Sequence, residues 1–134
     1  FWDVIEHLED PLVHLKKARE LLKPDGLLIV ETQNVESRFA RVMGKNWQHY
    51  KMAEHLYHFG PTTVRTLLDR AGFDVIENTG KRGGKKVSFD FIRERVGKIH
   101  PVLSTLASPL KLIGRASLYV NLFDEMLVVA KKRA

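Results

Sequence analysis

The chain of 134 residues, with 44% hydrophobic and 28% charged side chains, has the size and composition of one ordinary globular domain. It contains no cysteine, which excludes disulfide bonds and thiolate metal sites and fits a reducing cytoplasm. The longest aliphatic run, Met126–Ala130, is far shorter than the roughly 20 residues that a membrane-spanning helix needs, so the sequence predicts a cytoplasmic protein without such a helix.

The charge is unevenly distributed along the chain. Residues 1–80 hold 10 Lys and Arg against 12 Asp and Glu, a net −2, whereas residues 81–134 hold 12 against 4, a net +8. A basic half of this kind favours an anionic partner, either nucleic acid or an anionic membrane surface. Its charges lie in segments with wide aliphatic faces, which indicates a membrane surface and no nucleic acid. The alternative is the solvated surface of an ordinary helical cap.

The first stretch, Phe1–Pro11, is typical of the end of a buried strand followed by an acidic loop. Asp10 before Pro11 predicts a helix start, because the carboxylate caps free amides and proline at the first helical position loses no hydrogen bond. Hydrophobic residues then recur at helical spacing until Lys23–Gly26 ends the helix. The next run, Leu27–Val30, is apolar throughout, which predicts a strand buried on both faces.

A strand, a crossover helix and a second strand in this order form half of a parallel α/β unit. Ligands of such sheets bind outside the carboxyl ends of the strands. Trp2 and Asp3 lie at the first of these ends, and Glu31–Asn34 lie at the second. We therefore expect the functional site at this edge of the sheet.

A short helix is predicted over Glu36–Met43, with Phe39, Val42 and Met43 turned inward. Gly44 follows in the position of a carboxyl-terminal cap. The chain then enters a segment of a different character.

The segment Lys45–Phe59 has no regular period and is rich in aromatic and histidine residues. Loops of this length are uncommon in compact domains unless they are functional, so the segment is predicted to be a lid over the substrate. The alternative is an irregular loop held in place by its aromatic side chains. The residues expected to contact the substrate are Trp47, His49, Tyr50, His55 and His58 in this segment, together with Asn34.

Another helix and a strand complete the first part of the chain. Thr62 or Thr63 is expected to cap the helix, and Gly72 to end it. Phe73–Asn78 then alternates as a strand does. The basic segment Lys81–Lys86 is interpreted as a solvated turn, because it matches no phosphate-binding loop.

The remaining sequence predicts a helical insertion followed by a last strand. From Ser88 the apolar residues repeat at helical spacing, and Pro101 and Pro109 mark the starts of one or two further helices. The segment 88–119 is therefore expected to form an insertion, or cap, beside the sheet. Met126–Ala130 is the last strand.

Five runs of residues carry a resemblance to a known family. They are D-V-I-E-H-L-E-D-P at Asp3–Pro11, L-L-K-P-D-G at Leu21–Gly26, E-H-L-Y-H-F at Glu54–Phe59, L-L-D-R-A-G-F at Leu67–Phe73 and D-E-M-L-V-V-A-K-K at Asp124–Lys132. In this order they resemble the class I S-adenosylmethionine-dependent methyltransferases. Within this superfamily they are most similar to the branch of the ubiquinone-biosynthesis O-methyltransferases and the methyltransferases of cell-surface saccharide pathways.

The resemblance implies an α/β fold and a cofactor. The fold is the carboxyl-terminal half of a Rossmann-like sheet, with strands 4, 5, 7 and 6 in this spatial order and the last strand antiparallel between its two neighbours. The family's glycine-rich loop and ribose-binding acid would precede Phe1, so residues 1–134 are expected to be the carboxyl-terminal part of a longer methyltransferase domain. The implied cofactor is S-adenosylmethionine, with Trp2 and Asp3 passing its methionine end. A core position is the alternative for Trp2.

Methyl transfer from a sulfonium mainly requires that two reactants are positioned and water is excluded. A hydroxyl acceptor also benefits from a general base, and histidine is the usual one. His7 is the predicted base, since the resemblance puts it near the transferred methyl; a structural histidine is the alternative. Glu54, His55 and His58 have the residue types of a metal site, but without a fixed scaffold no metal is predicted.

The main hypothesis is therefore S-adenosylmethionine-dependent methyl transfer to a small-molecule, saccharide or lipid-linked acceptor, with this part alone inactive. The insertion is expected to cap the acceptor site and rest on a membrane periphery. The alternative hypothesis is a non-catalytic module that self-associates, because a bare sheet edge invites pairing into a homodimer.

Overall fold

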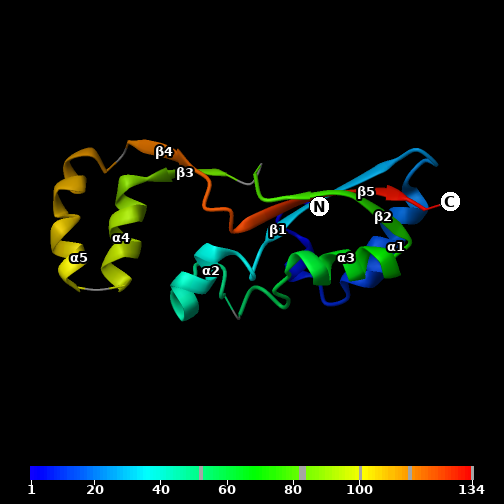
Figure 1. The fold of residues 1–134 in the computed structure, drawn as a ribbon, viewed down its shortest axis with the longest axis horizontal. Helices are drawn as coiled ribbons and strands as arrows, with labels where there is room; N and C mark the ends of the chain where they lie inside the picture. Colours follow the sequence, from blue (N-terminus) through cyan, green and yellow to red (C-terminus); the bar gives the residue numbers. More distant parts are fainter. Residues whose placement is uncertain (52, 82–83, 100, 115, 134) are drawn as a thin grey trace. The chain divides into compact units, whose positions relative to one another are not determined.

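A computed structural model describes residues 1–51, 53–81, 84–99, 101–114 and 116–133. The chain forms two compact units (Figure 1). The main unit comprises Phe1–Gly83 and Leu122–Ala134, and the second unit comprises Gly84–Asn121. Each unit has its own sheet.

The sheet of the main unit has the strand order β1 (Leu27–Gln33), β5 (Glu125–Lys132), β2 (Phe73–Thr79). β5 pairs antiparallel with both neighbours, so β1 and β2 run in the same direction. Trp2 forms an isolated parallel bridge with Glu31 on the free side of β1. The predicted order of strands 4, 5, 7 and 6, with an antiparallel last strand between its neighbours, is confirmed.

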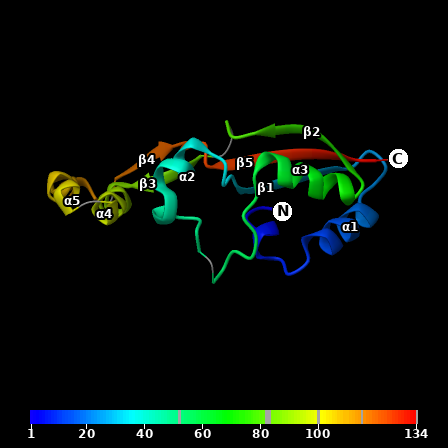
Figure 2. The ribbon, with the colours of Figure 1, turned by 60° about the horizontal axis from the view of Figure 1, so that its bottom comes forward.

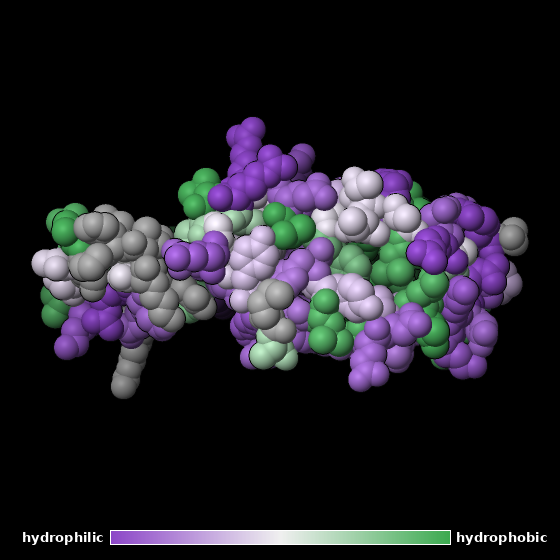
Figure 3. All heavy atoms as spheres, turned by 90° about the horizontal axis from the view of Figure 1, so that it is seen from below, coloured by the Kyte–Doolittle hydropathy of each residue, from purple (hydrophilic) through white to green (hydrophobic). Residues whose placement is uncertain are grey.

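Two helices cover one face of this sheet, α1 (Pro11–Leu21) and α3 (Pro61–Arg70) (Figure 2). The apolar residues of this face and of the two helices form a single core. Seen from the helix side, hydrophobic side chains show between hydrophilic ones (Figure 3). The buried core residues are Ile5, Leu15, Leu28, Val30, Phe59, Val64, Leu68, Ala71, Phe73, Met126, Val128 and Ala130.

The prediction that Leu27–Val30 is buried on both faces is wrong. Leu28 and Val30 are buried, whereas Leu27 is 51% and Ile29 45% exposed. The reason is that both helices lie on the same face, and successive side chains of a strand point to opposite faces. Trp2 is 64% exposed, so its alternative interpretation as a core residue is also wrong.

The predicted start of α1 is confirmed, because the Asp10 carboxylate accepts a hydrogen bond from the Val13 N–H at 3.1 Å. The predicted cap of α3 is wrong. Pro61 takes the first helical position, which moves the cap back to Gly60. Thr63 stabilises this start from inside the helix, since its hydroxyl accepts from the Gly60 N–H at 2.8 Å.

The other helix boundaries near the site follow the sequence closely. α2 (Arg38–Met43) is capped by Ser37 and ends at Gly44, which begins the short 3-10 helix η2 (Gly44–Asn46). Val42, predicted to turn inward, is 84% exposed, and Ala40 takes the buried position. Two residues that are two positions apart lie on nearly opposite sides of a helix. Burial of Ala40 therefore leaves Val42 exposed.

Gly72 ends α3 with a φ of +85°, in the left-handed region that glycine adopts without strain. A Cβ at this position would also meet the Arg19 side chain, whose Nε donates to the Gly72 carbonyl at 3.2 Å. The predicted role of Gly72 is therefore confirmed, and it includes a close contact between α1 and the start of β2.

The second unit contains a two-stranded sheet and three helical segments. β3 (Lys85–Ser88) pairs antiparallel with β4 (Ser117–Val120). Between them lie α4 (Phe89–Ile99), α5 (Pro101–Leu106) and the 3-10 helix η3 (Ser108–Ile113). The helix starts predicted near Ser88, Pro101 and Pro109 are thus confirmed, and the range 88–119 lies within this unit. Its role as a cap of the acceptor site stays a prediction.

The basic segment Lys81–Lys86 was predicted as a turn, and this is wrong for its last residues. Lys81 lies in a turn, positions 82 and 83 are outside the described residues, and Lys85 and Lys86 begin β3. The partner strand β4 lies far away in the sequence, so no local pattern indicated the pairing. No helix in the described ranges is long and apolar enough to cross a membrane.

Candidate active site

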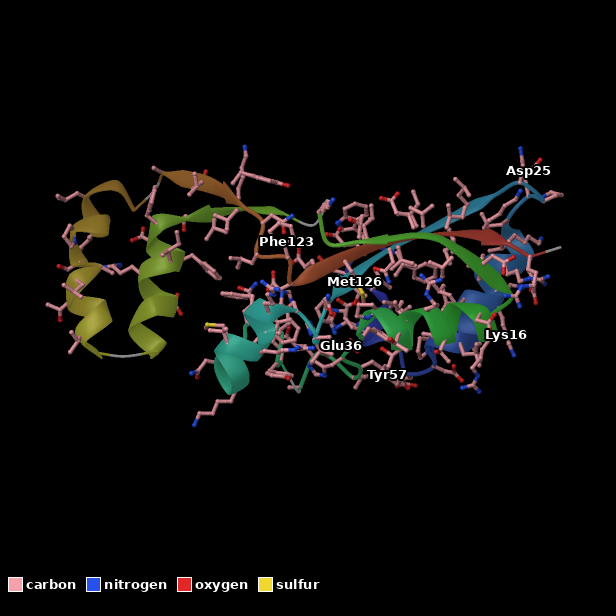
Figure 4. All side chains as sticks on the ribbon, viewed as in Figure 1. Lys16, Asp25, Glu36, Tyr57, Phe123 and Met126 are labelled. Carbon is pink, nitrogen blue, oxygen red and sulfur yellow. The ribbon has the colours of Figure 1, made fainter. Side chains whose placement is uncertain are left out.

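The site lies where β1 and β2 end, at the end of the sheet marked by Glu36 and Met126 and opposite to Asp25 (Figure 4). Here the irregular segment 45–59 is tied to two other parts of the chain. The Glu6 carbonyl accepts from the Leu56 and Tyr57 N–H groups at 2.9 and 3.2 Å. The Gln33 side-chain amide donates to the Tyr57 carbonyl at 2.8 Å. The structure therefore brings together the regions that the sequence predicted to form the site.

His7 ends the 3-10 helix η1 (Ile5–His7), whose Ile5 is part of the core. Its Nδ1 lies 2.7 Å from the Glu54 carbonyl oxygen. A carbonyl only accepts hydrogen bonds, so Nδ1 carries the proton in this contact. In the neutral ring Nε2 then has a free lone pair, and His7 is in the tautomer that a general base at Nε2 needs.

The ring of His55 meets the ring of His7 edge to face, with centroids 4.7 Å apart. His55 is buried, at 7% exposure. Burial, and then the nearby His7, lower the pKa of His55 below its usual value. Its Nδ1 has no hydrogen-bond partner among the described residues. His55 is therefore a neutral ring at pH 7 with a nitrogen available to a ligand.

Glu6 is the third member of this group and was not predicted from the sequence. Its side chain is 2% exposed, and its Oε2 lies 3.0 Å from the Thr32 hydroxyl, which is also 2.7 Å from the Gln33 Oε1. Glu6, His7 and His55 each offer one ligand atom, and these atoms lie within 4.8 Å of one another. The signal that was overlooked is the position of Glu6 directly before His7.

Two imidazoles and a carboxylate are the ligand types of a zinc or similar divalent cation. The metal set considered from the sequence, Glu54 with His55 and His58, is not grouped in this way. The Glu54 carboxylate is exposed and lies 3.0 Å from the Lys51 ammonium, which lowers the pKa of Glu54. The structure thus groups His55 with Glu6 and His7.

A second group of contacts holds the start of the segment. Trp47, 2% exposed, donates from Nε1 to the Asp124 Oδ2 at 3.0 Å. The His49 Nε2 lies 3.6 Å from the same oxygen and 3.6 Å from the Glu125 Oε1. Asp124 was not selected from the sequence either. A buried carboxylate that accepts an indole N–H anchors the segment at the residue directly before β5.

The rings of this segment contact one another. Trp47 packs edge to face on Tyr50 with centroids 5.1 Å apart, and Tyr50 lies 5.2 Å from His58. His58 places its Nε2 3.2 Å from the His49 carbonyl. Burial and hydrogen bonding make Trp47 an anchor, as the alternative interpretation expected. Substrate contacts of Trp47, His49, Tyr50, His55 and His58 stay predictions.

The remaining predicted residues lie on the same edge. The Asn34 N–H donates to the Asp124 carbonyl at 2.7 Å, and its side-chain oxygen accepts from the Glu36 N–H at 3.0 Å. Asp3 has a φ of +49° and donates its N–H to the Glu31 carbonyl at 3.2 Å. Trp2 and Asp3 thus leave the sheet beside β1, where their contact with a cofactor stays a prediction.

The mixed sheet, its order and the position of the site at the strand ends define an α/β protein of the methyltransferase type. The profile of a family described as "Methyltransferase domain" matches residues 1–78, more than half of the chain. The chain belongs to this methyltransferase-domain family.

Individual relatives agree with this family. The ubiquinone biosynthesis O-methyltransferase of Cereibacter sphaeroides is 32% identical over 84 residues, which cover 58% of this chain and 34% of that protein. The tRNA U34 carboxymethyltransferase of Methylococcus capsulatus is 33% identical over 70 residues, covering 52% of this chain and 22% of that protein. The match thus spans about a third or less of these relatives' length.

Solved structures show the same fold. A methyltransferase of Thermotoga maritima, described as S-adenosylmethionine-dependent and a possible histamine N-methyltransferase, aligns with 98% of this chain and 53% of its own, with a TM-score of 0.55 and 20% identity. A putative methyltransferase of Bacillus halodurans aligns with 99% of this chain and 62% of its own, also with a TM-score of 0.55, at 16% identity. The predicted Rossmann-like methyltransferase fold is confirmed.

The lowered pKa of His55 makes the folded protein less stable in acid. The folded protein keeps His55 neutral at pH values where the unfolded chain, with an ordinary pKa of about 6.5, already binds a proton. The unfolded state therefore binds more protons, and the free energy of unfolding is expected to fall as the pH decreases below about 6.5. Urea unfolding at about pH 7.5 and about pH 5.5 measures this loss.

The loss should be smaller in the His55→Gln variant. The matched control is His14→Gln, because His14 is exposed on α1 with its Nδ1 2.8 Å from the Asp10 carbonyl. An acid-induced loss of the same size in His55→Gln and in the unmodified protein would contradict the prediction.

The grouping of Glu6, His7 and His55 predicts that added Zn²⁺ binds and stabilises the folded protein. At a free concentration of 100 times its Kd, an ion that binds only the folded state adds about 2.7 kcal/mol to the free energy of unfolding. Thermal unfolding with Zn²⁺ and with a chelator measures the gain. It should disappear in His7→Gln and in His55→Gln and persist in His14→Gln; an equal gain in all four proteins would show binding elsewhere.

Proposed function

We propose that the whole protein transfers a methyl group from S-adenosylmethionine to a hydroxyl group of a small-molecule, saccharide or lipid-linked acceptor. The observation that carries the proposal is the position of His7, in the base-competent tautomer, at the strand ends of a methyltransferase-domain fold. The names of the ubiquinone-biosynthesis relatives support an oxygen acceptor. The ring-rich segment beside His7 is suited to contact a small acceptor.

Residues at this edge fit the methionine end of the cofactor. Asp3 is exposed where the chain leaves the sheet, and its carboxylate suits the cationic end of such a molecule. Trp2 beside it offers an exposed ring of the kind that contacts cations. When bound, S-adenosylmethionine supplies a methyl group on a sulfonium, which departs as a neutral thioether.

The proposed role of His7 is to accept the proton of the acceptor hydroxyl at Nε2 while the hydroxyl oxygen forms its bond to the methyl carbon. The Glu54 carbonyl keeps the ring in the required tautomer. Neutral His55 beside it adds no positive charge that would oppose proton uptake. Segment 45–59, anchored by Trp47, would exclude water from the reacting atoms.

The whole protein is expected to bind S-adenosylmethionine, measured by calorimetry, and to methylate a hydroxyl-bearing acceptor. Loss of a general base typically lowers the rate by a factor of roughly 10² to 10⁴, so His7→Gln should lower kcat by this order while cofactor binding is retained. His14→Gln is the control, because its Nδ1 also contacts a carbonyl while the residue is exposed on α1, outside the group of Glu6, His7 and His55. An unchanged kcat and pH profile in His7→Gln would remove His7 from the mechanism.

The second hypothesis, a non-catalytic self-associating module, is favoured by the apolar side chains on the open sheet face. Leu27 is 51% and Ile29 45% exposed. The same calorimetry separates the two classes. If neither the cofactor nor its demethylated product releases heat and the protein sediments as a dimer, the module replaces the enzyme.

We also propose that the second unit contacts an anionic membrane surface. Its residues 84–121 hold 7 Lys and Arg against 2 Asp and Glu, a net +5. Several of its apolar side chains are exposed, most of all Leu112 at 91% and Leu106 at 71%. Basic charge with exposed aliphatic side chains is the composition of an interfacial segment. The acceptor of such an enzyme would be hydrophobic or lipid-linked.

Co-sedimentation with vesicles tests this proposal. Binding is expected with anionic and not with neutral vesicles, and it should weaken as salt increases, because each basic residue contributes about 1 kcal/mol at such a surface. Lys111→Glu should weaken binding. The matched control is Lys16→Glu on α1, also an exposed lysine, which should bind as the unmodified protein does. Equal binding to both vesicle types would reject the proposal.

A further inference from the structure

A cavity of about 340 Å³ opens at the carboxyl ends of β1 and β2, outside the group of Glu6, His7 and His55. It lies entirely in the main unit, and its volume is in the range of small-molecule sites. Three of the segments around it converge from distant parts of the chain: the end of β1, the first turns of α3 and the end of β2. Its lining residues are Asn34, Pro61, Thr62, Arg65, Asn78, Gly80 and Met126.

Each polar side chain in this lining carries a hydrogen-bond donor, and none is a carboxylate. Arg65 brings a full positive charge. Asn78 has a side-chain nitrogen that is inaccessible to solvent and finds no hydrogen-bond acceptor among the described residues. A buried amide without an acceptor costs free energy, so a rotation of the Asn78 side chain that brings this nitrogen to a ligand oxygen in the cavity would be favourable.

A neighbouring cavity of about 390 Å³ lies beside the same helix, and it contains carboxylates that neutralise an arginine. It is lined by Arg65, Arg133, Asp69 and Asp74 among others. There Arg133 lies 2.6 Å from the Asp69 and 2.7 Å from the Asp74 carboxylate. Arg65 lines both cavities, and no ion pair of its own occurs within the described ranges. The positive charge of Arg65 therefore remains available to a ligand.

We propose that the cavity beside Arg65 binds the carboxylate or phosphate group of a small-molecule ligand. The Arg65 guanidinium would form the charged contact, because its planar donors match two oxygens of either group. The hydroxyl of Thr62 and the amide groups of Asn34 and Asn78 would supply further hydrogen bonds. Met126, a buried core residue, is the apolar part of the lining at the end of β1 and β2.

Because the cavity lies beside the active-site edge, we expect the anionic group to belong to the methyl acceptor. Asn34 joins the cavity to the active-site edge, since Gln33 before it holds the Tyr57 carbonyl. The identification of the ligand with the acceptor rests on the proposed function. The anion binding itself does not, because it depends only on the residues that line the cavity.

One nearby carboxylate, that of Glu36, is expected to lower the affinity of the cavity for an anion. The Glu36 side chain lies against Gly60, directly before Pro61, and Glu36 is exposed. Its negative charge opposes an anion at this edge. Removing this charge should therefore strengthen anion binding, whereas removing the charge of Arg65 should weaken it.

The test is an NMR titration of the protein with inorganic phosphate in one series and with acetate in a second, each at constant ionic strength. The Arg65 side-chain N–H and the Asn78 amide signals are expected to shift in a saturable manner with at least one of the two. A shift with phosphate alone or with acetate alone identifies the group. No saturable shift at these signals with either anion would overturn the proposal.

Four variants make the result specific. Arg65→Gln and Asn78→Asp should each weaken binding tenfold or more, the second by placing a carboxylate in the cavity without a large change of shape. Glu36→Gln should tighten it. Arg70→Gln, which removes a charge from the last turn of the same helix, should leave the Kd unchanged. Equal weakening in Arg65→Gln and Arg70→Gln would reduce the effect to net charge and overturn the site.

The readout uses neither S-adenosylmethionine nor methyl transfer. Anion binding without cofactor binding would support the cavity and remove the proposed function. Cofactor binding without anion binding would support the proposed function and reject the anion site in the cavity. A methylation assay with matched acceptors, with and without a carboxylate, then decides whether the acceptor is the ligand: Arg65→Gln should raise KM only for the anionic acceptor.

Discussion

The arrangement of the site depends on Glu6. Its backbone carbonyl accepts the Leu56 and Tyr57 N–H groups, and its buried carboxylate contacts the Thr32 hydroxyl. Through these contacts Glu6, in η1, connects the chain after the Trp2 bridge to segment 45–59 and to the end of β1. A buried carboxylate is costly unless its oxygens are paired, so the contact with Thr32 stabilises the folded main unit as well as the site. His7 obtains its position directly from its neighbour in the chain.

Asp124 has the corresponding role at the other side of the segment. It precedes β5 and is 2% exposed, and its side chain accepts from the Trp47 indole while its carbonyl accepts from the Asn34 N–H. The segment between these two acids has almost no regular structure of its own. Its geometry is therefore set by the two buried acids at its ends and by the contacts among its rings, and not by local helix or strand preference.

Most of the fold could be predicted because its signals are local. Asp10 before Pro11, the helical spacing of α1 and α3, and the apolar run of β5 each depend on neighbours in the sequence. The order of the strands came from the resemblance, not from these patterns. The exposed Leu27 and Ile29 were wrongly predicted to be buried, because a run of apolar residues does not say whether one face or both are covered.

The site was predicted less completely than the fold. The histidines and aromatic residues were selected by type, and the structure brings His7 and His55 together. Glu6 and Asp124 were missed because a buried acid looks like a surface acid in a sequence, and its partners, Thr32 and Trp47, lie 26 and 77 positions away. The pairing of β3 with β4 was missed for the same reason, since strand pairing depends on distant residues.

Two possible roles of His7 exclude each other, and this constrains the chemistry. With Nδ1 bound to the Glu54 carbonyl, only Nε2 is available, either to a proton or to a cation. The hydrogen bond from Nδ1 to the Glu54 carbonyl fixes the tautomer that a general base needs. The same hydrogen bond also orients the ring for a metal ion at Nε2. A cation held by Glu6, His7 and His55 would itself lower the pKa of a hydroxyl bound to it, so deprotonation of the acceptor would not need a free histidine.

The environment of His55 is consistent with either role. Because burial lowers the pKa of His55, the ring is neutral at pH 7 and available as a ligand or as a neutral neighbour of the base. A protonated His55 would serve neither, since it would repel a cation and oppose proton uptake by His7. The two roles of His7 therefore differ only in whether a proton or a cation occupies its Nε2, and the buried carboxylate of Glu6 beside it favours positive charge there in both cases.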